Sequence, residues 1–328
     1  MKTKQSGFQS LLAEEIKAFI AYKRALGRRF HTEEGALHLL DRHLCENGVT
    51  DTATITAELL DGFLASRPRT QPRSYNHLVG VLRRFFDWLA NQERLCPSPL
   101  RTHPRRISSQ RRPFLFDAIQ VRHLLEIATH LPDNSRALHR GCIYPMIFAL
   151  LYGLGLRVGE VSRLRRKDVD LDRQLLTIRQ TKFGKSRLVP FGPRMAKRIS
   201  DYIRSCEQHV GTLQPNSPLF SFGKDKPIHP GTISQTFHHL LPQLNLEMPP
   251  GITPPRVHCL RHSFAVRTLL RWYRAGIDPS QRLIYLSTFL GHVNPTSTAV
   301  YLSITVELLQ VAGERFARFS RPLLREVE

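Results

Sequence analysis

The 328-residue sequence lacks any uninterrupted apolar run of the roughly 18–20 residues that a transmembrane helix requires. Its N-terminus, MKTKQSGFQS, also lacks the apolar core of a signal peptide. Cysteine is scarce, and the five that are present lie far apart, at Cys45, Cys96, Cys142, Cys206 and Cys259. Because their number is odd and no C-x-x-C pair occurs, neither a disulfide framework nor a zinc ribbon is indicated. These absences predict a cytoplasmic protein of a reducing compartment with no membrane partner.

Acidic residues are also few. Asp and Glu total 27 against 48 Lys and Arg, which gives a net charge of +21. So large a positive excess indicates a polyanionic partner, because Lys and Arg that neutralise phosphates release condensed counterions. A membrane surface is the competing explanation for basic charge, but without an apolar segment we favour nucleic acid.

Clusters of metal ligands are sparse. The closest acidic group comprises Asp168, Asp170 and Asp172. Its spacing fits a polar turn that leads into a strand, and we favour that interpretation over a metal site. Cys259 stands between His258 and His262, but a structural zinc ion needs four ligands and no second pair lies at ligand spacing. We therefore predict no metal and no cofactor.

The first hundred residues are predicted to be helical. Apolar residues recur at helical spacing in four segments, residues 12–20, 36–44, 59–64 and 78–89. Four short amphipathic helices can share one small core, so we predict a helical domain over residues 1–100.

A basic linker, residues 101–115, is predicted to follow. The surrounding segment CPSPLRTHPRRISSQRRP contains five arginines, four prolines and no acid. Because proline fixes φ and removes a helix donor, this segment should be extended and solvated. It is either a soluble hinge or a linker that lies along a phosphate backbone, and the two roles are compatible. The residues expected to bind DNA in the second role are Arg105, Arg106, Arg111 and Arg112.

The remaining chain, residues 116–328, is predicted to form a second, mostly helical domain. Helices are expected over residues 118–129, 143–152, 159–166 and about 263–274. The segment LLTIRQTKFGKSRLVPF (175–191) alternates apolar and polar residues on both sides of Lys-Phe-Gly-Lys, a pattern typical of a β-hairpin. The predicted fold class is therefore mainly α with a small antiparallel sheet (α+β).

Two arginines stand at predicted helix starts. Arg157 in LLYGLGLRVGEVSRL follows two glycines, and Glu160 stands three residues later. A half-buried Arg is costly unless it is paired. Either Glu160 is simply that partner, or Arg157 holds a phosphate while Glu160 keeps the guanidinium in place. In VHCLRHSFAV, His258 and Arg261 stand three apart at a helix start, where free N–H groups favour an anion.

The hairpin adds three cationic candidates. Lys182 and Lys185 lie at or beside its tip, and Arg187 lies on the following strand. Exposed lysines at turns are ordinary solvating residues, and the alternative for Lys185 and Arg187 is contact with DNA. Lys182 has a further role if the tip folds over a bound strand, because an ammonium there can donate a proton to a departing oxygen.

The stretch LSTFLGHVNPTSTAVYLSIT places His292 nine residues before Tyr301. Two-metal phosphoryl transfer needs converging carboxylates, which this candidate set lacks, so Arg must neutralise the phosphate instead. A phenol has a pKa of about 10 and becomes a nucleophile once positive charge stabilises its phenolate. Attack on a DNA phosphate would give a phosphotyrosine, from which another DNA hydroxyl reseals the strand without ATP.

With its motifs in this order, the chain resembles the tyrosine recombinase (phage integrase) family over about residues 113–305. The motifs that carry the resemblance are GLGLRVGEVSRL, TKFGKSRLVPF, HCLRHSFA and FLGHVNPTSTAVY. The helical module before them resembles the core-binding domain with which the family clamps DNA. The resemblance implies a site-specific recombinase or integrase that acts through a 3′-phosphotyrosine and a Holliday junction.

The resemblance also implies a role for each motif residue. Arg157 and Arg261 would bind the scissile phosphate, with support from His258. Lys182 would be the acid for the 5′-oxygen. His292 would be the histidine that hydrogen-bonds the phosphate. Tyr301 would be the nucleophile, and Glu160 would be a supporting acid.

Between Gly276 and the Leu-Gly-His step, the run IDPSQRLIYLSTF is longer than the commonest family pattern. In this it is similar to the branch carried by transposons and other mobile elements. Family members act as tetramers on two duplexes. The implied partners are therefore double-stranded recombination sites and a homo-tetramer, or a hetero-assembly with related recombinases, on the bacterial nucleoid.

The tail, residues 305–328, has an amphipathic helical pattern. It packs on its own domain or, as the resemblance implies, on a neighbouring protomer in a closed ring. Two alternative functions stay open, a type IB topoisomerase-like activity and a non-catalytic DNA-binding accessory role.

Overall fold

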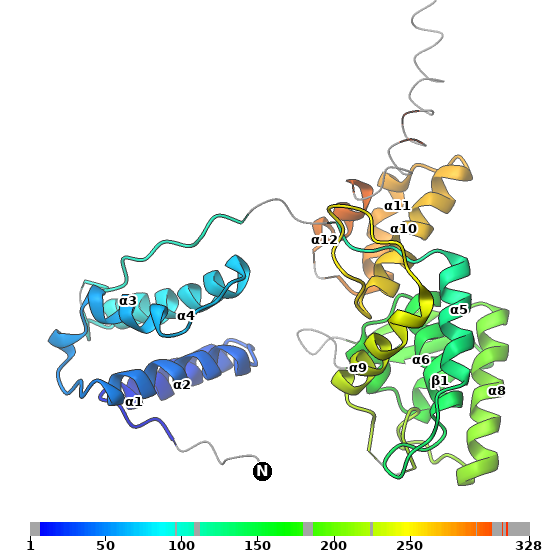
Figure 1. The fold of residues 1–328 in the computed structure, drawn as a ribbon, viewed down its shortest axis with the longest axis horizontal. Coiled ribbons are helices and arrows are strands. Elements are labelled where there is room, and N and C mark those ends of the chain that lie inside the picture. The colour runs from blue at the N-terminus through cyan, green and yellow to red at the C-terminus, as the bar shows by residue number, and fades with distance from the viewer. Residues whose placement is uncertain are drawn as a thin grey trace, which may run out of the picture. The chain divides into compact units, whose positions relative to one another are not determined.

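The computed structural model describes most of the chain, namely residues 7–95, 97–107, 112–179, 186–223, 226–292, 294–303, 310 and 313. The chain divides into two compact units, Met1–Gln110 and Arg111–Glu328. Each unit has a hydrophobic core of its own, and both are drawn in Figure 1.

The first unit is built from helices. They are α1 (Ala13–Ala25), α2 (His31–Glu46), the short 3₁₀ turn η1 (Thr52–Thr54), α3 (Ala57–Ala65) and α4 (Pro72–Asn91). Each α-helix buries one apolar stripe, as the four predicted segments require. Phe19, Phe63, Phe85 and Phe86 are fully buried between them. The four helices predicted for the first hundred residues are therefore confirmed.

Residues 97–107 run along the first unit without forming a helix or strand. The side chain of Asn76 on α4 bonds the backbone of Arg105 in both directions, at 2.8 Å to its carbonyl and 2.7 Å from its N–H. The guanidinium of Arg83 donates to the carbonyl of Thr102 at 2.7 Å. These bonds satisfy backbone groups that an extended segment leaves open, so this part of the predicted linker is fastened to α4.

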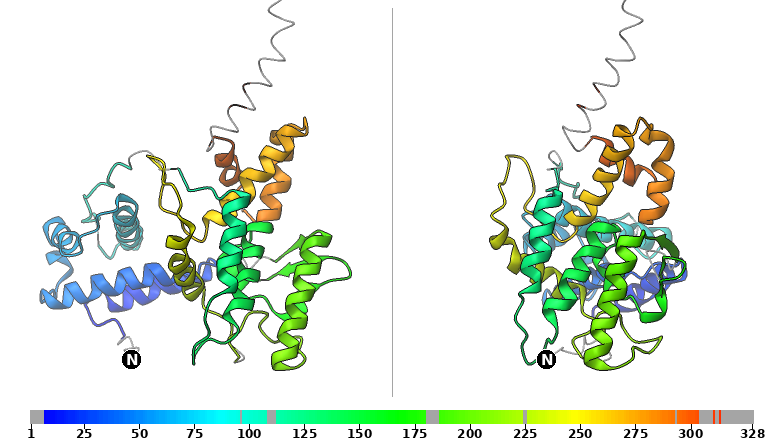
Figure 2. Two further views of the ribbon diagram at one scale, coloured as in Figure 1. Left: turned by 45° about the vertical axis from the view of Figure 1, so that its right-hand side comes forward. Right: turned by 90° about the vertical axis from the view of Figure 1, so that its right-hand side faces the viewer.

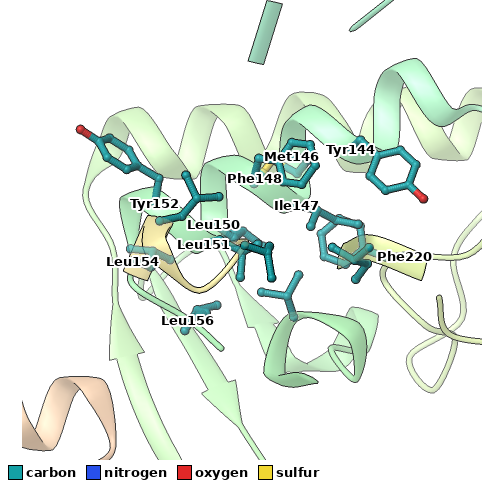
Figure 3. Packing of buried hydrophobic residues seen from close by; sticks show 14 of the residues in the cluster. Tyr144, Met146, Ile147, Phe148, Leu150, Leu151, Tyr152, Leu154, Leu156 and Phe220 are labelled. Carbon is teal, nitrogen blue, oxygen red and sulfur yellow. The ribbon is translucent and has the colours of Figure 1, made fainter. Parts of the chain in front are cut away.

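In the second unit, helices surround α6 (Arg140–Gly153). Contacts join α6 to α5 (Ala118–Thr129), α8 (Pro193–Val210) and α10 (Cys259–Arg274), and Figure 2 shows α5, α6 and α8 side by side. Every residue of α6 from Ile143 to Tyr152 is buried, because neighbours cover the helix on all sides. Figure 3 shows this packing, with Phe148 and Phe220 among the side chains that fill it.

A small antiparallel sheet lies beside these helices. Its strands are β1 (Val169–Asp170), β2 (Leu175–Ile178) and β3 (Arg187–Pro190), in the order β1-β2-β3. Ile178 pairs with Arg187 at the end of the ladder. The predicted hairpin strands are confirmed, and its tip, residues 180–185, lies outside the described residues. The predicted fold class, mainly α with a small antiparallel sheet, is also confirmed.

The helix predicted over residues 159–166 was wrong in length. Helix α7 (Val158–Ser162) ends early, and a 3₁₀ turn η2 (Arg166–Asp168) leads into β1. The carboxylate of Asp168 accepts the N–H of Arg165 at 3.0 Å and Nε of Arg179 at 2.6 Å. These two bonds stop the helix and make the polar turn that we favoured over a metal site.

The remaining elements close the second unit. They are α9 (Pro230–Leu240), η4 (Leu241–Leu244), α11 (Pro279–Leu290), α12 (Thr296–Ala299) and η5 (Val300–Ser303). Helices α10 and α11 and segment η5 enclose a separate small apolar cluster. Of the predicted tail, residues 305–328, all but 310 and 313 lie outside the described residues.

Candidate active site

Tyr301 lies on η5 and packs into the small cluster between α10 and α11, with 4% of its surface exposed. Its hydroxyl lies 2.9 Å from Nδ1 of His262 on α10. Burial raises the pKa of Tyr301, and the positive charges of Arg261 and Arg157 oppose that increase. The phenol is therefore protonated at neutral pH and can donate its hydrogen to His262.

Arg261 lies in the first turn of α10 and is only 1% exposed. Its Nη1 donates to the carbonyl of Gly155 at 2.6 Å and its Nη2 to that of Leu290 at 2.7 Å. Within the described residues its Nε has no hydrogen-bond partner. Burial, and then the charge of Arg157, lower the pKa of Arg261 to about 9, which leaves it charged at neutral pH. A buried guanidinium held by neutral carbonyls is costly unless an anion joins it.

Glu160 on α7 joins two further arginines. It is 4% exposed and accepts Nη1 of Arg157 at 2.8 Å and the backbone N–H of Arg157 at 2.9 Å. Arg187 on β3 reaches the same carboxylate with both terminal nitrogens, at 2.8 and 3.0 Å. Burial would raise the pKa of Glu160, but its bonds with Arg187 and Arg157 outweigh burial and lower the pKa to about 2. Glu160 therefore stays ionised and fixes both guanidinium groups.

Two glycines carry backbone carbonyls into this cluster. Gly155 bonds Arg261, and the carbonyl of Gly291 accepts Nη2 of Arg157 at 2.9 Å. Their φ angles are +60° and +67°, a region that side chains disfavour. A Cβ on Gly155 would lie 2.5 Å from a neighbouring ring, and one on Gly291 would lie 2.8 Å from Nη1 of Arg187. Glycine is therefore needed at positions 155 and 291, where the backbone approaches neighbouring side chains closely.

Three histidines gather at the phenol. The ring of His292 lies alongside that of Tyr301, with centroids 6.4 Å apart, and its Nδ1 is 2.7 Å from Oγ1 of Thr298. The rings of His258 and His262 meet edge to face at 4.7 Å. The residues between His292 and Tyr301 thus orient the ring of His292 through Thr298 and place the phenol next to His262.

The electrostatics of the cluster are strongly positive. Burial, followed by the charge of Arg261, lowers the pKa of both His262 and His292 to about 4. The pKa of His258 is also lowered, by desolvation and by the charges of Arg261 and Arg157. At neutral pH these imidazoles are therefore uncharged, and the arginines carry more positive charge than Glu160 balances. Such a site suits a phosphodiester, whose non-bridging oxygens can accept from the guanidinium groups.

The structure brings together most of the residues singled out in the sequence, namely Arg157, Glu160, His258, Arg261, His292 and Tyr301. Three others lie outside the described residues, namely Lys182, Lys185 and Arg111.

Arg187, which we predicted to bind DNA, is largely buried in the structure. Its side chain is 11% exposed, and Nε donates to the carbonyl of Phe289 at 2.9 Å while the terminal nitrogens bind Glu160. Strand β3 directs the side chain of Arg187 toward α7, where it is the second arginine that bonds the buried carboxylate of Glu160. The structure thus gives Arg187 a role inside the cluster, and its predicted DNA contact stays a prediction.

The linker arginines Arg105, Arg106 and Arg112 were predicted to bind DNA. The guanidinium of Arg105 lies 3.8 Å from the ring centroid of Tyr75 and donates to the carbonyl of Arg69 at 2.9 Å. Arg106 is exposed on the same segment. Arg112 is exposed in the second unit, where its backbone pairs with Ile252. Their predicted DNA contacts stay predictions.

His262 is the residue that sequence reasoning missed. We weighed it only as a zinc ligand with His258 and Cys259, yet its position directly after Arg261 in HCLRHSFA was the available signal. Among the described residues, no group of three His, Cys, Asp or Glu side chains is placed to hold a metal ion. In the same part of the chain, no helix is both long and apolar enough to cross a membrane.

Comparisons with known proteins identify relatives of this chain. The model of the phage integrase family matches residues 115–307. A protein of Sinorhizobium fredii named integrase/recombinase y4rB is 34% identical over 314 residues, which cover 94% of this chain and 98% of that protein. Tyrosine recombinase XerA of Thermococcus kodakarensis is 29% identical over 308 residues, covering 92% and 95% of the two chains.

Solved structures share the fold. The Tn1549 transposon integrase in complex with transposon right end DNA has a TM-score of 0.63 at 17% identity, covering 93% of this chain and 98% of that one. A lambda integrase tetramer bound to a Holliday junction has a TM-score of 0.62 at 17% identity, covering 88% and 76%. With its family match over more than half of the sequence, the chain belongs to the phage integrase family, and it is a tyrosine-type site-specific recombinase.

Proposed function

We propose that Tyr301 is the nucleophile with which this recombinase cuts DNA and forms a 3′-phosphotyrosine. The observation that carries the proposal is the buried phenol, held 2.9 Å from an imidazole nitrogen and beside the positive cluster of Arg157 and Arg261. Positive charge lowers the cost of forming a phenolate, and the same charge binds the phosphate that the phenolate attacks.

Arg157 and Arg261 would bind the two non-bridging oxygens of the scissile phosphate. The side chain of Arg157 is 30% exposed, so it can reach a bound strand while Glu160 holds it from behind. Arg261 is fixed by two carbonyls and keeps one buried N–H that has no partner among the described residues, which favours an anion at this place. Both guanidinium groups are thus oriented before DNA arrives, which reduces the reorganisation that the reaction requires.

The remaining roles follow from the sequence motifs. His258 and His292 would donate hydrogen bonds to the phosphate, and Lys182 would protonate the departing 5′-oxygen. The free 5′-hydroxyl of a partner strand then attacks the phosphotyrosine, which restores a phosphodiester and releases Tyr301. No high-energy cofactor is consumed, because the energy of the cleaved bond is kept in the tyrosyl ester.

The proposed partner is double-stranded DNA at two recombination sites held by a homo-tetramer, with strand exchange through a Holliday junction. Similarity to a lambda integrase tetramer bound to such a junction supports this assembly. The helical unit before Gln110, with its basic segment, would clamp the duplex and serve as the core-binding domain. A hetero-assembly with related recombinases is the alternative arrangement.

The setting that we propose is a bacterial mobile element whose DNA the protein integrates, excises or transposes on the nucleoid. Similarity to the Tn1549 transposon integrase supports this setting, as does the long run before Leu-Gly-His. The tail from residue 305 would dock on a neighbouring protomer rather than on its own domain.

The test uses nicked duplexes with a randomised core, incubated with the full-length protein and then denatured in SDS. We expect wild type to retain a defined set of sequences covalently, and mass spectrometry to find the nucleotide on Tyr301. The Tyr301→Phe variant should retain none, because it lacks the attacking oxygen. If wild type binds duplex DNA but forms no adduct, the chain is an accessory protein. If it relaxes plasmids that lack the selected site as fast as plasmids that carry it, its activity is topoisomerase-like.

A further inference from the structure

We propose that His262 is the general base that takes the proton of Tyr301 during strand cleavage. This inference rests on the proposed function, in which Tyr301 attacks the phosphate. Its basis is the contact between Nδ1 of His262 and the Tyr301 hydroxyl at 2.9 Å, within the range from which a base can remove a proton.

The other two histidines are placed for different partners. Nδ1 of His292 is engaged with the hydroxyl of Thr298 at 2.7 Å, and its ring lies flat beside the phenol ring. His258 meets the ring of His262 edge to face. The hydroxyl of Tyr301 instead contacts Nδ1 of His262, whose ring centroid lies 5.5 Å from that of the phenol.

The setting of His262 also keeps it ready to accept a proton. The groups that face it are Arg261 on its own helix, His258 directly before that helix, Tyr301 on η5 and His292 after α11. No carboxylate stands among these four partners, so the imidazole is neutral when the site is empty. A bound phosphate brings negative charge to the same place and raises the basicity of the imidazole when the proton must move.

The proton transfer balances in both directions. During cleavage the O–H bond of Tyr301 breaks, its proton moves to Nδ1 of His262, and the phenolate oxygen bonds to phosphorus. The bond from phosphorus to the 5′-oxygen breaks, and that oxygen takes a proton from Lys182. During resealing the 5′-hydroxyl returns its proton to Lys182, and His262 returns its proton to the departing phenolate.

Variants at position 262 separate a base from a residue that only positions the phenol. The assay measures the single-turnover rate of covalent adduct formation on a nicked duplex selected by wild type. We expect His262→Ala to be about 100- to 10,000-fold slower, the usual contribution of a general base. His262→Asn keeps a hydrogen-bond acceptor near Nδ1 but cannot take a proton, so it should stay within about tenfold of the Ala variant. His123→Ala, an exposed histidine on α5, is the matched control and should equal wild type.

The pH dependence supplies a second readout. Wild type should reach a plateau in rate above the pKa of His262, whereas the Ala variant should gain about tenfold per pH unit up to pH 9, because its phenol must ionise before it attacks. Added imidazole should restore part of the rate of His262→Ala. A flat profile for the Ala variant would overturn the proposal, as would a wild-type rate for His262→Asn.

A substrate with sulfur in place of the bridging 5′-oxygen isolates this proton transfer from that of Lys182. The thiolate leaves without protonation, so this substrate should restore Lys182→Ala and leave His262→Ala slow. Restoration of both variants would place His262 on the leaving-group side and overturn the proposal. If wild type forms no adduct on any substrate, the proposed function itself fails. If wild type and His262→Ala are equally fast, only the role of His262 fails.

Discussion

Replacing Glu160 by Gln keeps the shape of a buried side chain and removes the negative charge that holds two arginines. Lowering the pKa from 4.5 to about 2 corresponds to a contribution of about 3 kcal/mol to the free energy of unfolding. Glu160 is 4% exposed, so solvent screens little of this contribution. We therefore expect Glu160→Gln to lower the unfolding free energy by about 3 kcal/mol at pH 7, since two guanidinium groups lose their anion.

The effect has a defined pH dependence. The folded-state pKa of Glu160 is depressed, so its stabilisation is fully present above the unfolded pKa of 4.5 and is lost as pH falls toward about 2. The difference between wild type and Glu160→Gln should therefore shrink from about 3 kcal/mol at pH 7 to about 2 kcal/mol at pH 3.5. A difference that stays constant over this range would show that the loss comes from packing and not from charge.

The assay needs a signal from the second unit alone. The chain has two tryptophans, Trp88 in the first unit and Trp272 in the second. In a Trp88→Phe background, urea unfolding followed by fluorescence reports the unit that holds Glu160. Asp201→Asn is the matched control, because this carboxylate is 47% exposed where it meets Lys197. The control should change stability by less than about 1 kcal/mol. A loss below about 0.5 kcal/mol for Glu160→Gln would refute the reasoning.

Two further substitutions test the backbone and side-chain supports of the site. Gly291→Ala should lower the unfolding free energy more than Gly276→Ala in the same urea assay. Both positions have positive φ, but only at Gly291 would the new Cβ meet Arg187, at 2.8 Å; equal losses would contradict this. Thr298→Val removes the hydroxyl that bonds His292, so we expect a loss of about 1 kcal/mol and slower adduct formation. Unchanged stability and rate would show that this bond does not matter.

The elements of the fold were largely predictable because apolar spacing is a local property. Helix α5 was predicted with its observed bounds, and the hairpin strands followed from alternation on both sides of a turn. Helix α8 was not predicted, although its sequence is strongly amphipathic. The helix expected over residues 159–166 was too long because the carboxylate of Asp168 accepts the N–H of Arg165. The same carboxylate is held by Arg179, a contact from later in the chain that periodicity does not contain.

In the candidate site, too, some features were predictable from the sequence and others depended on the tertiary structure. The sequence by itself determined the chemistry, since two arginines, histidines and a tyrosine without converging carboxylates favour phosphate transfer through a phenol. It also determined that Glu160 lies within reach of Arg157, because residues three apart share a helix face. Only the tertiary structure decided that Arg187 is buried against Glu160 and that Tyr301 meets His262. These contacts join residues that are 27 and 39 positions apart, and their geometry depends on how α7, β3, α10 and η5 pack together.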